Sequence, residues 1–196
     1  DVTVDELERQ VMKDDIFFRS SGGGVTLSGG EVLMQAPFAT QFLKRLRRYG
    51  IHTAIETAGD APLSRLLLLA RQCDEVLFDL KIMDAEQARL VVAMNLPRVL
   101  DNFLHLTAEG VNVIPRVPLI PGYTLNRTNM ARVLAFLLPS GIRQLHLLPF
   151  HQYGEPKYRL LGQQWEMRQV APPGEVDVAE MRQMAEQEGF HVTVGG

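Results

Sequence analysis

The sequence predicts an α/β protein whose parallel sheet forms a barrel or an incomplete barrel. Short runs rich in β-branched and aliphatic residues alternate with longer segments in which apolar residues recur at helical spacing. This alternation is typical of βα units joined by right-handed crossovers. About five or six such units follow one another, which favours a barrel over an open sheet, although periodicity alone does not choose between the two.

The composition excludes several classes of protein. The 196 residues are 46% hydrophobic and 22% charged, which is enough for one domain with its own core, and we expect residues 1–196 to be a single domain. The net charge of −3 gives no basic field for nucleic acid. No apolar run is long enough to span a membrane and no signal peptide is recognisable. The single cysteine, Cys73, excludes an internal disulfide and fits a cytoplasmic location.

The first helix is marked by its N-terminal cap. Thr3 is followed three residues later by Glu6, the pattern of a capping box, and the helix is expected to run to about Met12. Its buried face is expected to consist of Val4, Leu7 and Val11. The chain thus opens with a helix, and the strand that should precede it is missing. The next strand, residues 25–27, is therefore expected to have an unpaired edge.

The later elements are delimited mainly by proline at helix starts and glycine at helix ends. The expected helices are residues 37–49, 62–72, a short one capped by Asp84 and Gln87, 97–109, 128–138, and a last one capped by Asp177 and Glu180. The expected strands after residues 25–27 are residues 52–57, 75–79, 111–117, 143–148 and 190–194. Residues 150–175 are expected to form a long connection.

Residues 22–31, with the sequence GGGVTLSGGE, form a short strand flanked by glycines and followed by a glutamate. A phosphate-binding Walker loop is excluded because no Lys-Ser/Thr pair follows, and a dinucleotide fingerprint because the triple glycine precedes the strand. Glu31 would also repel a phosphate. A carboxylate beside accessible backbone carbonyls suits a cationic group such as an ammonium, whereas the simpler interpretation is a β-turn with a solvated glutamate.

Polar residues follow the carboxyl ends of the expected strands, where parallel α/β folds bind ligands. The segments that contain them are Ser28-Gly29-Gly30-Glu31, Glu56-Thr57, Asp79-Leu80-Lys81, Arg116 and His151. Carboxylates mixed with cations suit a zwitterion such as an amino acid. A salt-bridge network that closes the mouth of the barrel is an equally acceptable interpretation of these residues.

Five segments in order carry a resemblance to a known family. They are residues 22–31, residues 56–59 (ETAG), residues 79–81 (DLK), residues 116–122 (RVPLIPG) and residues 148–154 (LPFHQYG). This series resembles the glycyl-radical-enzyme activating enzymes of the pyruvate formate-lyase activating type, within the radical S-adenosylmethionine superfamily. The resemblance covers essentially the whole chain. It implies an incomplete parallel (β/α) barrel of the radical-SAM type, with the first strand missing here.

The resemblance also implies an activity, cofactors and partners. The family reductively cleaves S-adenosylmethionine at a [4Fe–4S] cluster, with reduced flavodoxin or ferredoxin as electron donor, and abstracts hydrogen from a glycine of a partner such as pyruvate formate-lyase. By resemblance, the methionine ammonium is bound by Gly29, Gly30 and Glu31. The methionine and its carboxylate are oriented by Asp79, Lys81 and Arg116. The ribose or adenine is contacted by His151. Glu56, Thr57 and the Leu77 carbonyl hold a monovalent cation.

Three departures from the family pattern matter. Glu56 stands where the family often has aspartate, and Val32 where it commonly has proline. More important, the three spaced cysteines that bind the cluster are absent, and Cys73 cannot replace them. We therefore expect the chain to be the C-terminal part of a longer protein, inactive by itself and with weakened S-adenosylmethionine binding.

Two alternatives stay open. One is a non-catalytic barrel that has lost its cluster and only binds a partner protein. The other is an ordinary barrel isomerase or lyase that uses Asp79, Lys81 and His151 for proton transfer.

Overall fold

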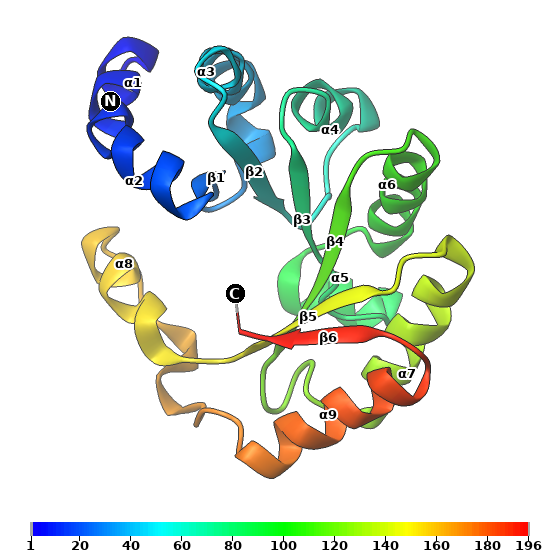
Figure 1. Ribbon diagram of the computed structural model, residues 1–196. Helices are drawn as coiled ribbons and strands as arrows, with labels where there is room; N and C mark the ends of the chain where they lie inside the picture. The colour runs from blue at the N-terminus through cyan, green and yellow to red at the C-terminus, as the bar shows by residue number, and fades with distance from the viewer. Residues whose placement is uncertain (1, 196) are drawn as a thin grey trace. The chain divides into compact units, whose positions relative to one another are not determined.

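Six parallel strands in chain order make up the sheet in the computed structural model, which describes residues 2–195 (Figure 1). The strands are β1 (Gly24–Leu27), β2 (His52–Thr57), β3 (Glu75–Asp79), β4 (Val113–Leu119), β5 (Gln144–Pro149) and β6 (His191–Val194). Pairing is parallel from β1 to β2 and β3, and again from β4 to β5 and β6. The predicted α/β class is therefore confirmed.

Contacts within the chain define two compact units. The first contains the residues up to Asp79 together with Arg89–Ile114, and the second contains Leu80–Ala88 together with the residues from Pro115 onward. The helices of the first unit are α1 (Val4–Val11), α2 (Asp15–Ser21), α3 (Ala36–Arg48), α4 (Leu63–Ala70) and α6 (Leu96–Ala108), and those of the second are α7 (Arg127–Leu137), α8 (Glu155–Leu160) and α9 (Glu175–Gln187). Helix α5 (Ala85–Val92) contributes residues to both units. No helix in the described part of the chain is long and apolar enough to cross a membrane.

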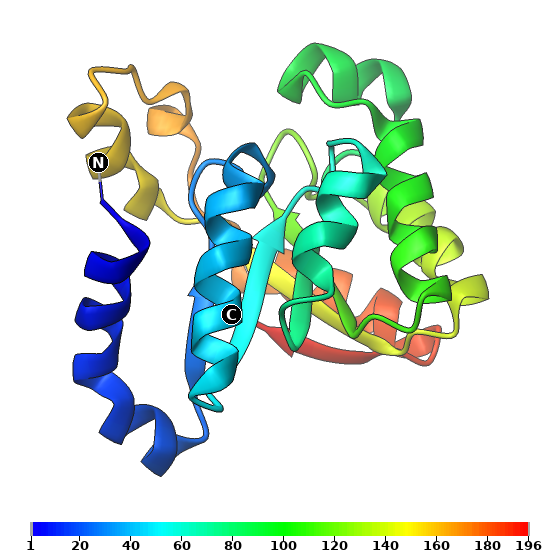
Figure 2. The same ribbon diagram turned by 90° about the horizontal axis from the view of Figure 1, so that it is seen from above.

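The predicted cap of α1 is confirmed. The Thr3 hydroxyl accepts a hydrogen bond from the Glu6 amide at 3.2 Å, and the Glu6 carboxylate accepts one from the Thr3 amide at 2.8 Å. Helix α1 lies beside α3 (Figure 1, Figure 2). Its apolar residues are half-buried rather than fully buried, and they pack with residues of β1 against Phe42, Leu46 and Ile51.

The ion pairs between α1 and α3 reinforce this packing. Arg45 on α3 pairs with both Asp5 and Glu8 on α1. The Tyr49 hydroxyl also donates to Glu8 at 2.6 Å. Helix α1 is therefore joined to α3 by an apolar contact on one side and by charged groups on the other. Strand β1 is first in the sheet order and, among the described strands, pairs only with β2, as expected.

Two helices were not expected from the sequence. Helix α2 was missed because its apolar residues, Ile16, Phe17 and Phe18, are consecutive and do not recur at helical spacing. Phe18 packs against the core, whereas Ile16 and Phe17 are 71% and 65% exposed. Helix α8 lies inside the expected connection of residues 150–175, which also contains two 3-10 helices, Gln152–Gly154 and Glu166–Gln169.

Two boundary predictions were wrong. Helix α9 is capped at Gly174, whose amide donates to Asp177 at 3.3 Å, whereas Glu180 pairs with Arg127 on α7 instead of capping the helix. Strand β4 continues to Leu119, so Arg116 lies inside the strand and not at its end. The two prolines of this strand did not stop it, although proline cannot donate to a ladder of hydrogen bonds.

Candidate functional site

Glu31 is the best-defined polar group at the end of β1. Its Oε1 accepts hydrogen bonds from the Leu33 amide at 3.2 Å and from the Thr57 hydroxyl at 2.7 Å, and its Oε2 accepts one from the Ala58 amide at 3.1 Å. All three donors are neutral, and no ion pair involves Glu31 among the described residues. The carboxylate is thus held in one orientation by donors that do not neutralise its charge.

Glu31 also organises the chain that follows it. The bond from the Leu33 amide caps the 3-10 helix Val32–Gln35, which leads directly into α3. Because side chains that accept from the first amides of a helix stabilise its start, the same carboxylate joins the strand to the helix. The interpretation of Glu31 as a freely solvated turn residue is therefore wrong.

A pocket of about 280 Å³ lies next to this carboxylate. Ser28, Gly29, Gly30 and Glu31 form its polar side, and Leu7 and Phe38 are among its apolar residues. A Cβ atom added to Gly29 or Gly30 would meet nothing within 4 Å, so the backbone here borders open space. Gly29 has φ +133°, a conformation that side-chain-bearing residues rarely adopt. The volume is at the lower limit for small-ligand sites and suits a group of amino-acid size.

The turn after β2 supplies two of the three donors to Glu31. Thr57 is 3% exposed, and its hydroxyl accepts a hydrogen bond from the Gly59 amide at 2.9 Å. The buried Asn102 on α6 donates from Nδ2 to the Gly59 carbonyl at 2.7 Å and to the Ala61 carbonyl at 2.8 Å. The turn is therefore held by Asn102 on α6 as well as by Glu31.

The register of β2 and β3 places the residues of the predicted cation site near one another. Glu56 is opposite Leu77 and Thr57 is opposite Phe78. The Thr57 hydroxyl, however, is already engaged with Glu31 and Gly59. Asp79 is the last residue of β3 and is half-buried. The cation site remains a prediction.

The second unit contains the three remaining predicted site residues. Arg116 is 7% exposed, and its carbonyl accepts a hydrogen bond at 2.8 Å from the amide of Leu80, the residue after β3. The carbonyl of the half-buried Lys81 accepts one at 2.8 Å from Asn129 on α7. His151 is exposed just beyond β5.

His151 has a defined orientation despite its exposure. Its Nδ1 accepts from the Tyr153 amide at 3.3 Å, and the two rings lie with their centroids 4.3 Å apart. Since Nδ1 accepts this hydrogen bond, a neutral ring carries its proton on Nε2. The segment that follows is tied down by Gln152, whose Nε2 donates to the Met167 and Val170 carbonyls at 2.8 and 2.7 Å.

The structure therefore brings Glu31 and Thr57 into direct contact, places Glu56 beside Leu77, and sets Arg116 beside Leu80. Sequence reasoning missed the two buried asparagines, Asn102 and Asn129, that hold the loops after β2 and β3. The sequence could have indicated them, because each is a polar residue on the apolar face of a helix.

The residues of this chain cannot bind an iron–sulfur cluster that needs three cysteine thiolates as ligands. Cys73 is the single cysteine, and burial raises the pKa of its thiol to about 11. It lies two residues before the start of β3, at the opposite end of the strand from Asp79, with Sγ 3.6 Å from the Ala70 carbonyl. Among the described residues no group of three His, Cys, Asp or Glu side chains could hold a metal ion.

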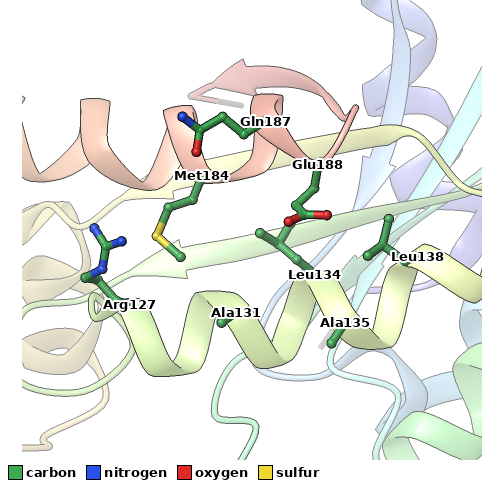
Figure 3. Close-up of a pocket in the computed structure, with 8 residues that line it drawn as sticks. All are labelled: Arg127, Ala131, Leu134, Ala135, Leu138, Met184, Gln187 and Glu188. Atoms are coloured by element: carbon green, nitrogen blue, oxygen red, sulfur yellow. The ribbon is translucent and has the colours of Figure 1, made fainter.

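A second pocket, of about 300 Å³, lies between α7 and α9 (Figure 3). Ala131 and Ala135 have small side chains on α7, and Met184 extends from α9 toward the end of α7 that carries Arg127 (Figure 3). None of the predicted site residues lines this pocket, and Arg127, which does, pairs with Glu180 on α9. We attribute it to imperfect helix packing and not to the site.

Comparison with known proteins agrees with the resemblance. A family model described as "Radical SAM superfamily" matches residues 1–134. The chain is 71% identical over 196 residues to the pyruvate formate-lyase 2-activating enzyme of Escherichia coli (strain K12), covering 100% of this chain and 67% of that protein. It is 32% identical to the trans-4-hydroxy-L-proline dehydratase activating enzyme of Clostridioides difficile, covering 99% of this chain and 65% of that protein. The chain thus spans about two thirds of these relatives.

Solved structures show the same fold. A domain of a pyruvate-formate lyase-activating enzyme from Bacteroides vulgatus superposes with a TM-score of 0.73 and 27% identity, covering 89% of this chain and 99% of that one. A radical SAM methyltransferase from Sphaerobacter thermophilus superposes with a TM-score of 0.75 at 16% identity, covering 98% of this chain and 57% of that one. These matches confirm the incomplete (β/α) barrel. The chain therefore belongs to the radical SAM superfamily, within the group of activating enzymes that the pyruvate formate-lyase activating enzymes represent.

Proposed function

We propose that this chain is the S-adenosylmethionine-binding part of an activating enzyme that installs a glycyl radical on a partner of the pyruvate formate-lyase type. The family match and the names of the relatives support the reaction class. The observation that carries the proposal for this chain is the Glu31 carboxylate, which three neutral donors hold beside an open glycine backbone.

The binding roles follow from the chemistry of each group. Glu31 and the carbonyls of Gly29 and Gly30 receive the methionine ammonium, because a carboxylate and carbonyl oxygens accept hydrogen bonds from it. The methionine and its carboxylate are proposed to contact Asp79, Lys81 and Arg116. The adenosine is proposed to contact His151. A monovalent cation is proposed to be bound by Glu56, Thr57 and Leu77. S-adenosylmethionine supplies the sulfonium whose cleavage starts the radical chemistry in this family.

The cluster chemistry is assigned to no residue of this chain. A [4Fe–4S] cluster needs several thiolates, and the chain has one cysteine with a protonated, half-buried thiol. We propose that these 196 residues bind S-adenosylmethionine weakly and do not cleave it. We propose cleavage only for a protein in which these residues are joined to a cluster-binding segment. For that protein we also propose reduced flavodoxin or ferredoxin as the electron donor, and a cytoplasmic location.

Calorimetric titration with S-adenosylmethionine tests this proposal. The wild-type chain should bind, and Glu31→Gln should bind about ten- to hundredfold more weakly, the effect of losing a hydrogen bond between charged groups. Glu86→Gln, which changes an exposed carboxylate of α5, is the matched control and should bind like wild type.

Two outcomes would contradict it. A wild-type chain that does not bind S-adenosylmethionine would favour a barrel that only binds a partner protein. Affinity equal to that of a cluster-loaded relative would show that the cluster contributes nothing to binding, against the proposed weak site.

A further inference from the structure

We infer that Thr57 is a positioning residue, whose hydroxyl fixes the Glu31 carboxylate in the orientation that receives the ligand's ammonium. This inference rests on the proposed function, since it concerns how the ammonium site is built. It assigns to the Thr57 hydroxyl a role different from that of a cation ligand, so the monovalent cation proposed above would use the Thr57 carbonyl and not its hydroxyl.

The direction of the hydrogen bonds is determined by the contacts. The Gly59 amide donates to the Thr57 hydroxyl at 2.9 Å, so one lone pair of the oxygen is occupied. The single hydroxyl proton then points to Glu31 Oε1, 2.7 Å away. Thr57 is 3% exposed, so water does not compete for this proton.

The hydroxyl is itself held in place through Gly59. Asn102 on α6 donates to the Gly59 carbonyl at 2.7 Å, and the Phe78 ring covers the Gly59 Cα, where an added Cβ would lie 2.2 Å from the ring. A continuous series of hydrogen bonds thus runs from α6 through Gly59 and Thr57 to Glu31.

Thr57 is also the one side chain that contacts Glu31 by a hydrogen bond among the described residues. The other two donors are the Leu33 and Ala58 amides, at the longer distances of 3.2 and 3.1 Å. A glutamate side chain has three rotatable bonds and loses rotamer entropy when it binds a ligand. Because Thr57 restricts those bonds beforehand, less of the binding free energy is lost on ordering the carboxylate.

The test compares Thr57→Val and Thr57→Ser for binding of S-adenosylmethionine and of 5′-methylthioadenosine, which lacks the amino-acid end. Thr57→Val keeps the volume of the side chain and removes the hydroxyl. It should weaken S-adenosylmethionine binding about tenfold and leave 5′-methylthioadenosine binding unchanged. Thr57→Ser keeps the hydroxyl and should restore affinity to within about twofold of wild type.

The same titrations in sodium, potassium and choline chloride separate the two roles of Thr57. A positioning role predicts that the loss in Thr57→Val is the same in all three salts. A loss that appears only with one inorganic cation would overturn the inference in favour of a cation ligand. So would wild-type affinity for S-adenosylmethionine in Thr57→Val, or an equal loss for both ligands.

A measurement on the wild-type chain covers the case in which Thr57→Val does not fold. S-adenosylmethionine should shift the NMR signals of the Leu33 and Ala58 amides, which donate to Glu31, and 5′-methylthioadenosine should not. Equal shifts with both ligands would overturn the inference. If wild type shows no preference for S-adenosylmethionine over 5′-methylthioadenosine, it is the proposed function that fails.

Discussion

Gly59 illustrates how a residue without a side chain fixes the loop that presents a binding group. Its φ of +69° lies in the left-handed region, and an added Cβ would lie 2.2 Å from the Phe78 ring. Phe78 cannot move aside easily, because it is fully buried and its ring packs edge-to-face on Phe103 at 5.2 Å. The turn after β2 therefore requires glycine both for its backbone angle and for space.

Gly59→Ala is expected to destabilise the chain by about 3 kcal/mol or more, through backbone strain together with overpacking against Phe78. Gly110→Ala is the matched control, since Gly110 has φ +73° but an added Cβ would meet nothing within 4 Å. It should cost only about 1 kcal/mol. Urea unfolding of both variants measures the difference, and equal losses would show that the Phe78 contact contributes nothing.

Cys73 predicts a pH dependence of stability. Burial raises the pKa of its thiol from 9.0 to about 11. Between these values the unfolded chain releases the thiol proton and the folded chain keeps it, so the stability contributed by this group is present below pH 9 and is lost as the pH rises toward 11.

The free energy of unfolding should fall by about 1 kcal/mol more in wild type than in Cys73→Ser when the pH is raised from about 8 to about 10. Taking the difference between the two proteins removes the contribution of lysines and tyrosines that titrate in the same range. An identical pH dependence in both proteins would contradict the burial of the thiol.

Among the elements, α6 and α7 have the same function toward the loops after the strands. Each places a buried asparagine against the loop after a strand: Asn102 donates to the Gly59 and Ala61 carbonyls, and Asn129 bonds to the carbonyl of Lys81 and the amide of Met83. Such groups are costly to bury and are retained where they satisfy backbone groups that no helix or strand satisfies.

Asn102→Leu should lower the free energy of unfolding by about 2–4 kcal/mol, because two buried carbonyls lose their donor while the volume is kept. Asp101→Asn, at the exposed neighbouring position on α6, serves as control and should change stability by less than about 0.5 kcal/mol. Denaturant unfolding followed by circular dichroism gives both values. A loss below about 1 kcal/mol in Asn102→Leu would mean that the Gly59 and Ala61 carbonyls find other donors.

The elements also show what local patterns can predict. The cap of α1 and the bounds of β2 and β3 were predicted correctly, because capping residues and alternating or continuous apolar runs are local in sequence. Helix α2 was not predicted, because consecutive apolar residues, two of them exposed, weaken the helical pattern. The end of β4 was not predicted, because its prolines weaken the pattern of a strand. The contact of Glu31 with Thr57, 26 residues apart, had no local signal at all.

At the scale of the whole molecule, the parallel sheet explains why the site residues are spread so widely along the chain. Each strand has only a few predicted site residues near its carboxyl end, and the proposed ligand would therefore need residues from more than one strand. Each of the five segments that resemble the family includes the carboxyl end of one strand, from β1 to β5. The hydrogen bonds that orient Glu31 were not predictable from the sequence, because two of their donors lie 26 and 27 residues further along the chain.

The most direct test of the central claim is an amide NMR map of the wild-type chain titrated with S-adenosylmethionine. We predict shifts at residues 29–31 and 79–81 and at Arg116 and His151. Two results would contradict the claim that the strand ends bind a sulfonium amino acid. One is a set of shifts confined to the pocket between α7 and α9, at Ala131 and Met184. The other is the absence of a shift at every predicted residue.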